Sequence, residues 1–405
     1  MYAKKLSIYE FKCFQKATLS LQYPGRTGKG VSAIANINVL LGDNGGGKSS
    51  VLRALAIAVL APALMHSGFV PYRLVRRLAS GEPAATKSLL KVNAAPDPQE
   101  LTAGLRTKME LLARLDAASK GSRDRIHLEQ TPDSPILPLL DDDDSPTFFV
   151  VGYGATRRVE TGDYSPSSAR RSRGLRYQRI AGLFEDHVAL RPLTSWLSLE
   201  KLGANRFEEA VGLLDAVLPD NIRFTGDLSL DEDQYLFEFE GMPTPFSALS
   251  DGYKAFVGWV GDLLGNLVDV APQEKRLNSV TGIVLVDEID LHLHPGWQRQ
   301  VVPLLAATFP LLQFILSSHS PLVASSVQRE NIFISDRLED GTATIVQSSE
   351  HAYGQSVEHI LLSSYFGLPT TRPASFEEAA QRLFERAARG DISAAMEFLQ
   401  RVSKP

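Results

Sequence analysis

The sequence predicts an α/β fold with a mixed sheet flanked by helices. Short runs of apolar residues at 283–286 and 314–316 are typical of parallel strands that are covered on both faces. Segments 5–9 and 17–21 instead alternate between apolar and polar residues, as half-buried strands do. Helical patterns lie between these strands, so both kinds of element belong to one α/β architecture.

The composition excludes several classes of protein. The chain has 405 residues, of which 44% are hydrophobic and 22% charged, with a formal net charge of −5. This balance indicates a folded protein without an overall basic field, although a local basic face remains compatible with it. A single cysteine, Cys13, excludes a disulfide framework and a cysteine-cluster metal site.

The sequence also gives no membrane signal. The most apolar run, 54–65, contains Pro62, and a membrane-spanning helix needs about 20 apolar residues. Lys4 and Lys5 are not followed by the apolar core of a signal peptide. We therefore expect a soluble, cytoplasmic protein without membrane contact.

The order of the patterns suggests five regions. After the first strands the pattern becomes helical at 49–60, and the proline-rich stretch that follows has an expected helix at 99–120 and an acidic run at 141–144. We interpret this stretch as a surface insertion. A buried strand at 148–151, helices within 184–218, a hairpin at 222–239, a helix at 256–268 and Ala-rich helices at 376–402 follow. The expected regions are an N-terminal lobe (1–66), a variable insertion (67–147), a helical lobe (148–275), a core (276–350) and a C-terminal helical segment (351–405). No sustained heptads occur, so no long coiled coil is expected.

Residues 42–49 read GDNGGGKS and match the phosphate-binding pattern G-x-x-x-x-G-K-[ST] at every fixed position. A strand at 39–41 precedes the motif and a helix at 50–60 follows it, which argues against a chance match in a glycine-rich turn. Glycines allow successive N–H groups to face phosphate oxygens at a helix N-terminus. Lys48 would neutralise β- and γ-phosphates, and Ser49 would bind Mg²⁺. The expected nucleotide-binding set is Gly42, Asn44, Gly45, Gly47, Lys48, Ser49 and Ser50.

Two acids follow the apolar strand at 283–286. Asp287 would hold Mg²⁺ beside the phosphate-binding loop, and Glu288 would position or deprotonate the attacking water. Adjacent acids at a strand end also occur in solvated turns, but the P-loop in the same chain favours the catalytic interpretation.

His319 ends another apolar strand, within the sequence FILSSHS. Its imidazole would contact the γ-phosphate, and we expect it to be catalytic together with Glu288 and Lys48. His292 and His294 form an H-x-H pair beside Pro295, for which we favour structural packing over metal binding. Mg²⁺ is therefore the only metal that the sequence predicts.

Residues 249–253 read LSDGY and precede an expected helix. They resemble the ABC signature LSGGQ, in which Ser250 and Gly252 would aim N–H groups and a helix dipole at phosphate. Asp251 and Tyr253 depart from that pattern.

In this order the P-loop, LSDGY, VDEIDLHLHP and SSHSP resemble ABC-type ATPase heads of the SMC/RecF/OLD-like group. The sequences GYGATR at 152–157 and YGQS at 353–356 resemble stand-alone ATPases of anti-phage systems, nearest to the ATPase subunit of Septu-type systems. The resemblance implies an ATP-sandwich homodimer, or a higher homo-oligomer, in which Ser250 and Gly252 cap the partner's ATP and Asp290 belongs to the interface loop. It also implies a separate nuclease subunit, since no D-x-D pair follows His319.

An obvious Q-loop glutamine is missing, and Arg157 and Gln178 are both candidates.

A basic segment at 157–179 contains seven arginines with two tyrosines among them. Arginines beside aromatic rings can follow a nucleic-acid backbone, while the alternative is a solvated loop or contact with the nucleotide or a protein partner. The segment consists of Arg157, Arg158, Arg170, Arg171, Arg173, Arg176 and Arg179, with Tyr164 and Tyr177. Arg73, Arg76 and Arg77 point weakly in the same direction.

The leading hypothesis is an ATP-hydrolysing, SMC-like ATPase whose dimer closure gates a nuclease partner or nucleic-acid binding in anti-phage defence. The alternatives are the nucleotide-binding subunit of a membrane transporter, a DNA repair ATPase of the RecF type, and a scaffold in which ATP only holds an assembly together. The long stretch between the P-loop and LSDGY favours the SMC-like group over a transporter subunit.

Overall fold

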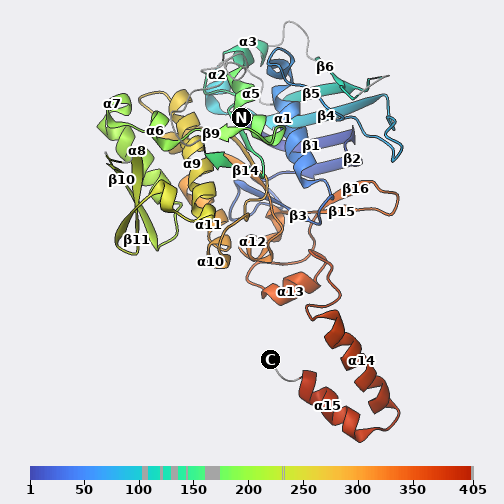
Figure 1. Ribbon diagram of the computed structural model, residues 1–405. Helices are drawn as coiled ribbons and strands as arrows, with labels where there is room; N and C mark the ends of the chain where they lie inside the picture. Colours follow the sequence, from blue (N-terminus) through green and yellow to red (C-terminus); the bar gives the residue numbers. More distant parts are fainter. Residues whose placement is uncertain are drawn as a thin grey trace. The chain divides into compact units, whose positions relative to one another are not determined.

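The computed structural model describes residues 1–102, 108–118, 122–128, 136–142, 145–159, 174–229, 231 and 233–402. Contacts divide the chain into two compact units, Met1–Gln355 and Ser356–Pro405, which are described separately (Figure 1).

A six-stranded sheet forms the centre of the first unit, in the order β16-β15-β3-β14-β13-β7. All neighbouring pairs are parallel except β15 and β16, so the sheet is mixed, as the sequence predicts. Every residue of β13 and β14 is buried, and the predicted apolar runs 283–286 and 314–316 lie within these strands. The strands are β3 Ile37–Gly42, β7 Val150–Tyr153, β13 Gly282–Val286, β14 Leu312–Ser317, β15 Ile332–Arg337 and β16 Ala343–Gln347.

A five-stranded antiparallel sheet lies beside it, in the order β2-β1-β4-β5-β6. Helix α1 (Lys48–Met65) contacts strands of both sheets, and its apolar side chains join them in one core. Among the described residues, α1 is the helix long and apolar enough to cross a membrane, but 72% of it is buried, as in a core helix. The strands are β1 Tyr2–Phe11, β2 Phe14–Ser20, β4 Lys87–Ala95, β5 Met109–Asp116 and β6 Arg125–Leu128.

The region 67–147 corrects two expectations. It is not a surface insertion, because it supplies β4, β5 and β6 and part of the buried core. The helix expected at 99–120 is wrong: α2 covers only Pro98–Thr102, and β5 is a strand whose alternate residues Met109, Leu111, Ala113 and Leu115 are buried. Pairing with β4 and burial of one face outweigh the helical propensity of these residues.

Buried amide side chains connect the two sheets. The Gln313 side chain, on β14, accepts a hydrogen bond from the Ala3 N–H and donates to the carbonyls of Ala3 and Gln22, each at 2.7 Å. The Asn38 side chain, on β3, accepts from the Gln22 N–H at 2.7 Å and donates to the Gln22 carbonyl at 2.9 Å. Buried polar groups satisfied in this way fix one relative placement of the packed elements.

A third region, on the opposite side of the first unit from the five-stranded sheet, contains a three-stranded sheet and helices α8 and α9 (Figure 1). The hairpin predicted at 222–239 is present as β10 and β11, and the helix predicted at 256–268 is the longer α9. The elements are β8 Arg158–Val159, β9 Ala189–Leu190, α6 Leu193–Trp196, α7 Leu199–Leu202, α8 Ala204–Asp215, β10 Ile222–Ser229, β11 Gln234–Phe239, β12 Met242–Pro245 and α9 Asp251–Val270.

Short helices complete the first unit. They are α2 Pro98–Thr102, α3 Ile136–Asp141, α5 Leu175–Gln178, α10 Pro295–Gln298, α11 Val301–Thr308 and α12 Pro321–Ser325, with 3₁₀ turns η1 Ala181–Leu183, η2 Phe246–Ala248, η3 Leu277–Ser279 and η4 Arg329–Asn331.

The second unit is helical, as the sequence predicts for 376–402. It consists of α13 Val357–Leu362, α14 Ala374–Ala388 and α15 Ile392–Val402. Helices α14 and α15 pack against each other, with the rings of Phe384 and Phe398 5.8 Å apart. The described residues contain no long coiled-coil pair of helices.

Candidate functional site

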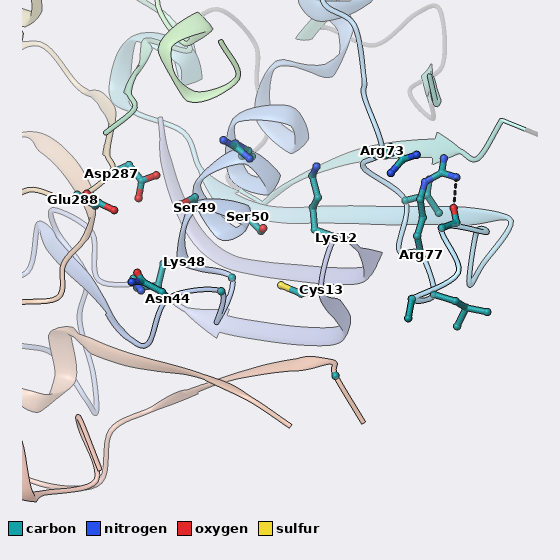
Figure 2. A pocket seen from close by; sticks show the side chains of 18 of the residues that line it. Lys12, Cys13, Asn44, Lys48, Ser49, Ser50, Arg73, Arg77, Asp287 and Glu288 are labelled. Carbon is teal, nitrogen blue, oxygen red and sulfur yellow. Dashed lines mark hydrogen bonds between the residues drawn. The ribbon is translucent and has the colours of Figure 1, made fainter. Parts of the chain in front are cut away.

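Three adjacent parallel strands, β3, β14 and β13, bring the predicted motifs together. The carboxyl ends of parallel strands meet at one edge of a sheet, so the P-loop follows β3, His319 follows β14 and Asp287–Glu288 follow β13 at the same edge. These segments line a cavity of about 650 Å³ (Figure 2). From the predicted set, its lining contains Asn44, Gly45, Gly47, Lys48, Ser49, Ser50, Asp287, Glu288 and His319.

The P-loop has the backbone that its glycines predict. Gly42, Gly45 and Gly47 have φ angles of 129°, 83° and 101°, in the region that side chains rarely adopt. Gly47 is also tightly packed, because a Cβ there would lie 2.6 Å from the Sγ of Cys13. Helix α1 begins immediately afterwards, at Lys48, so its free N–H groups open toward the cavity.

The Lys48 side chain is buried and lies along the loop that precedes it. Its Nζ donates to the carbonyl oxygens of Gly42 at 2.7 Å and Asp43 at 2.9 Å. Burial lowers the pKa of Lys48, while the nearby carboxylates of Asp287 and Glu288 act in the opposite direction. The ammonium is thus held in the cavity by weak carbonyl acceptors, which a phosphate oxygen can replace.

Asp287 and Glu288 are fixed by Ser317 of the neighbouring strand. The Ser317 hydroxyl donates to the carboxylate of Asp287 and accepts from the Glu288 N–H at 2.8 Å. Glu288 has a φ of 49°, which turns the chain sharply at the end of β13. Figure 2 shows both carboxylates on the same side of the cavity as Lys48 and Ser49.

His319 lies two residues beyond the end of β14, the middle strand of the three. Its backbone N–H donates to the carboxylate of Asp290 at 3.4 Å, and Asp290 itself does not line the cavity. Burial and the charge of Lys48 lower the pKa of the His319 imidazole, and Asp290 and Glu288 offset part of this effect. A lowered pKa keeps the ring neutral near pH 7, with one N–H to donate.

The signature residues lie outside this cavity. Ser250 is exposed at the start of α9, and Gly252 packs against the carbonyl of His292, to which a Cβ would approach within 2.2 Å. Asp251 and His292 line a separate cavity of about 720 Å³. His294 is exposed, and its Nδ1 accepts a hydrogen bond from the Gly296 N–H at the start of α10.

Several cations in the cavity were missed or misassigned from the sequence. Lys12 and Cys13, in the turn between β1 and β2, and Arg53 of α1 line it, and so do Arg73 and Arg77. In the predicted cluster, Arg77 pairs with Asp124 at 3.0 Å, while Arg76, which does not line the cavity, pairs with Glu10 at 2.6 Å. The cluster at 73–77 was the only sequence signal for any of these cations. It did not indicate that this part of the chain lies beside the P-loop.

The described part of the basic segment does not form a basic face. Arg176 is buried and donates to the carbonyls of Leu140, Asp142, Thr147 and Phe148 at 2.6 to 3.1 Å. Arg179 is buried with its guanidinium over the ring of Phe149. The nucleic-acid interpretation is wrong for these two arginines, because they serve internal packing. Arg170, Arg171, Arg173 and Tyr164 lie outside the described residues.

Neither candidate for the missing glutamine lines the P-loop cavity. Arg157 and Gln178 both line a small neighbouring cavity. The Arg157 guanidinium instead donates to the backbone carbonyls of Asp287 and Glu288, the latter at 2.6 Å.

The P-loop, LSDGY, Asp287–Glu288 and His319 all lie within one stretch of the chain that matches a known family. A family model described as "AAA domain, putative AbiEii toxin, Type IV TA system" matches residues 37–325. The chain belongs to this family. As an AAA domain it carries the nucleotide-binding fold that the three strand ends indicate.

Curated relatives of this AAA domain include the Septu protein PtuA of Bacillus mycoides, which is 26% identical over 92% of this chain and 46% of its own length. The Retron Vc95 probable ATPase of Vibrio cholerae is 44% identical over 28% of this chain and 22% of its own length. The chain thus spans less than half of the length of these relatives. Among solved structures, the SMC head domain from Thermotoga maritima aligns over 86% of this chain and all of that one, with 14% identity and a TM-score of 0.48.

Proposed function

We propose that the protein binds Mg-ATP in the P-loop cavity and hydrolyses it. The observation that carries this proposal is the meeting of a glycine-rich loop, two carboxylates and a neutral histidine at the ends of three hydrogen-bonded strands. A phosphate chain placed on the loop would meet N–H groups of the α1 N-terminus and the ammonium of Lys48. The cations of Lys12 and Arg73 would then face the rest of the nucleotide.

The residues present fit Mg²⁺. Ser49 and Asp287 offer a hydroxyl and a carboxylate in one cavity, and Mg²⁺ usually takes one or two such ligands together with phosphates and water. Consistent with this pattern, the described residues contain no cluster of three or more His, Cys, Asp or Glu side chains that would hold a metal on its own. When bound, Mg²⁺ would neutralise charge on the β- and γ-phosphates.

Glu288 is the proposed general base. Its carboxylate lies in the same cavity as Lys48 and would accept a proton from the attacking water. The neutral His319 ring would donate its N–H to the γ-phosphate. Lys48 would stabilise the charge that develops on the phosphate oxygens, so the three groups have separate roles.

We also propose a dimer in which each copy completes the other's site. The N–H groups at the start of the 20-residue helix α9 suit a phosphate, yet Ser250 is exposed and lines no part of its own P-loop cavity. A second copy can supply Ser250 and Gly252 to the first, with Asp290 at the interface. We propose that this dimer acts in anti-phage defence in the cytoplasm and gates a separate nuclease. The likeness to a Septu protein and to a retron ATPase supports the defence role.

The test compares Glu288→Gln with Glu200→Gln, a matched change at an exposed position of α7. We expect the first variant to lose at least 100-fold in ATP turnover while keeping ATP affinity, because the amide cannot accept a proton. Light scattering after chromatography with Mg-ATP should show a dimer for this variant. Normal turnover in Glu288→Gln would refute the catalytic assignment, and a monomer with bound ATP would refute the dimer.

A further inference from the structure

The segment GYGATR at 152–157 begins in β7, and its last residue, Arg157, forms hydrogen bonds with the acidic turn after β13. Gly154 passes so close to η1 that a Cβ there would lie 2.1 Å from the Gly182 carbonyl oxygen. The Tyr153 hydroxyl donates to the Asp262 carboxylate of α9 at 3.0 Å. The chain therefore leaves β7 in a fixed direction, and this direction delivers the Arg157 side chain to Asp287 and Glu288.

Arg157 binds backbone rather than carboxylates. Its Nε donates to the Gly154 carbonyl at 3.0 Å, and Nη2 donates to the carbonyls of both Asp287 and Glu288, the latter at 2.6 Å. Burial lowers the pKa of Arg157 to about 10, so the guanidinium remains charged near pH 7. The rigid fork of a guanidinium suits several acceptors at fixed positions.

The turn that Arg157 binds is strained. Glu288 has a φ of 49°, in the left-handed region that residues with a Cβ rarely adopt. The peptide is held on one side by Ser317, which accepts from the Glu288 N–H at 2.8 Å, and on the other by Arg157 at the Glu288 carbonyl. The two contacts hold the N–H and the carbonyl of Glu288, and the backbone conformation held in this way sets the direction of the Glu288 side chain.

We infer that Arg157 is a positioning residue for Glu288, which it holds in the left-handed conformation that aims the carboxylate into the cavity. The inference rests on the proposed hydrolysis for its effect on turnover. Arg157 itself lines the cavity that contains Asp251 and Lys254, not the P-loop cavity. Its loss should therefore lower the turnover number and leave ATP affinity unchanged.

The experiment compares the full chain with Arg157→Lys, Arg157→Ala and the control Arg158→Lys at the exposed neighbouring position. We expect a fall of about 10- to 100-fold in kcat for the Arg157 variants, because a misplacement of about 1 Å costs up to about 100-fold. The Kd for ATP should stay within about twofold, and added guanidinium should restore part of the activity of Arg157→Ala. Hydrogen exchange of the amides in 286–290 should become faster in both Arg157 variants.

Wild-type kcat and exchange in Arg157→Lys would overturn the inference, and so would a loss of ATP affinity as large as the loss of kcat. If Arg157→Ala fails to fold, Arg157→Lys decides the matter. A wild-type protein without turnover would refute the proposed function, and hydrogen exchange at 286–290 would still show whether Arg157 holds the turn.

Discussion

Replacement of Gln313 by leucine tests how the two sheets are held together. The change keeps the size of the side chain but removes its hydrogen bonds to the Ala3 N–H, the Ala3 carbonyl and the Gln22 carbonyl, each 2.7 Å long. At about 1 kcal/mol for each buried hydrogen bond, the loss is about 3 kcal/mol. This corresponds to a fall in Tm of roughly 4 °C for a unit of this size.

Urea unfolding followed by tryptophan fluorescence would measure the change, since Trp196, Trp259 and Trp297 are all buried in the first unit. Gln15→Leu at an exposed position of β2 is the control, with an expected change within about 0.5 kcal/mol. A loss below about 1 kcal/mol for Gln313→Leu would show that the amide bridge does not hold the sheets together.

Three further predictions concern the site. Lys48→Ala should weaken ATP binding by about 10- to 150-fold in a fluorescence titration, because a charge-assisted bond to phosphate contributes about 1.5–3 kcal/mol; unchanged affinity would contradict the P-loop assignment. Gly154→Ala should destabilise the protein by about 1–3 kcal/mol in urea, since its Cβ would overlap the Gly182 carbonyl, whereas a neutral result would show that the approach can relax. Because the pKa of His319 is lowered on folding, the ring resists protonation in the native state, and unfolding free energy should fall as pH drops below about 6.5. His319→Gln should lack this increment when urea curves at pH 7.5 and 5.5 are compared, and an identical pH dependence would refute it.

The sequence was most informative where one local pattern determines both structure and chemistry. Glycine spacing and a following lysine specify the P-loop backbone, and apolar strands that end in Asp287–Glu288 or His319 specify which edge of the sheet holds the polar groups. These groups meet because β3, β14 and β13 are neighbours in the sheet, in an order that differs from their order along the chain and that the motifs do not specify.

The rest depended on contacts between segments far apart in the chain. Strand β5 has the composition of a helix, and only its pairing with β4 and β6 makes it a strand. Lys12 and Arg73 reach the cavity from the five-stranded sheet and its connections, which no motif marks. Arg157 was noticed as a candidate for the nucleotide, but its acceptors are backbone carbonyls, which have no signature in a sequence.

The position of β14 between β3 and β13 sets the spacing of the groups in the P-loop cavity. Neighbouring strands lie about 4.8 Å apart, so the P-loop and Glu288 start about 10 Å from each other, with Ser317 at the end of the strand between them and His319 just beyond it. The hydrogen bonds that β14 makes with β3 and β13 maintain this spacing. Since side chains alternate between faces, a deletion of one residue within β14 would turn Ser317 away from Asp287 and Glu288. The interior of the sheet, rather than the surface loops, is therefore where changes in chain length would be least tolerated.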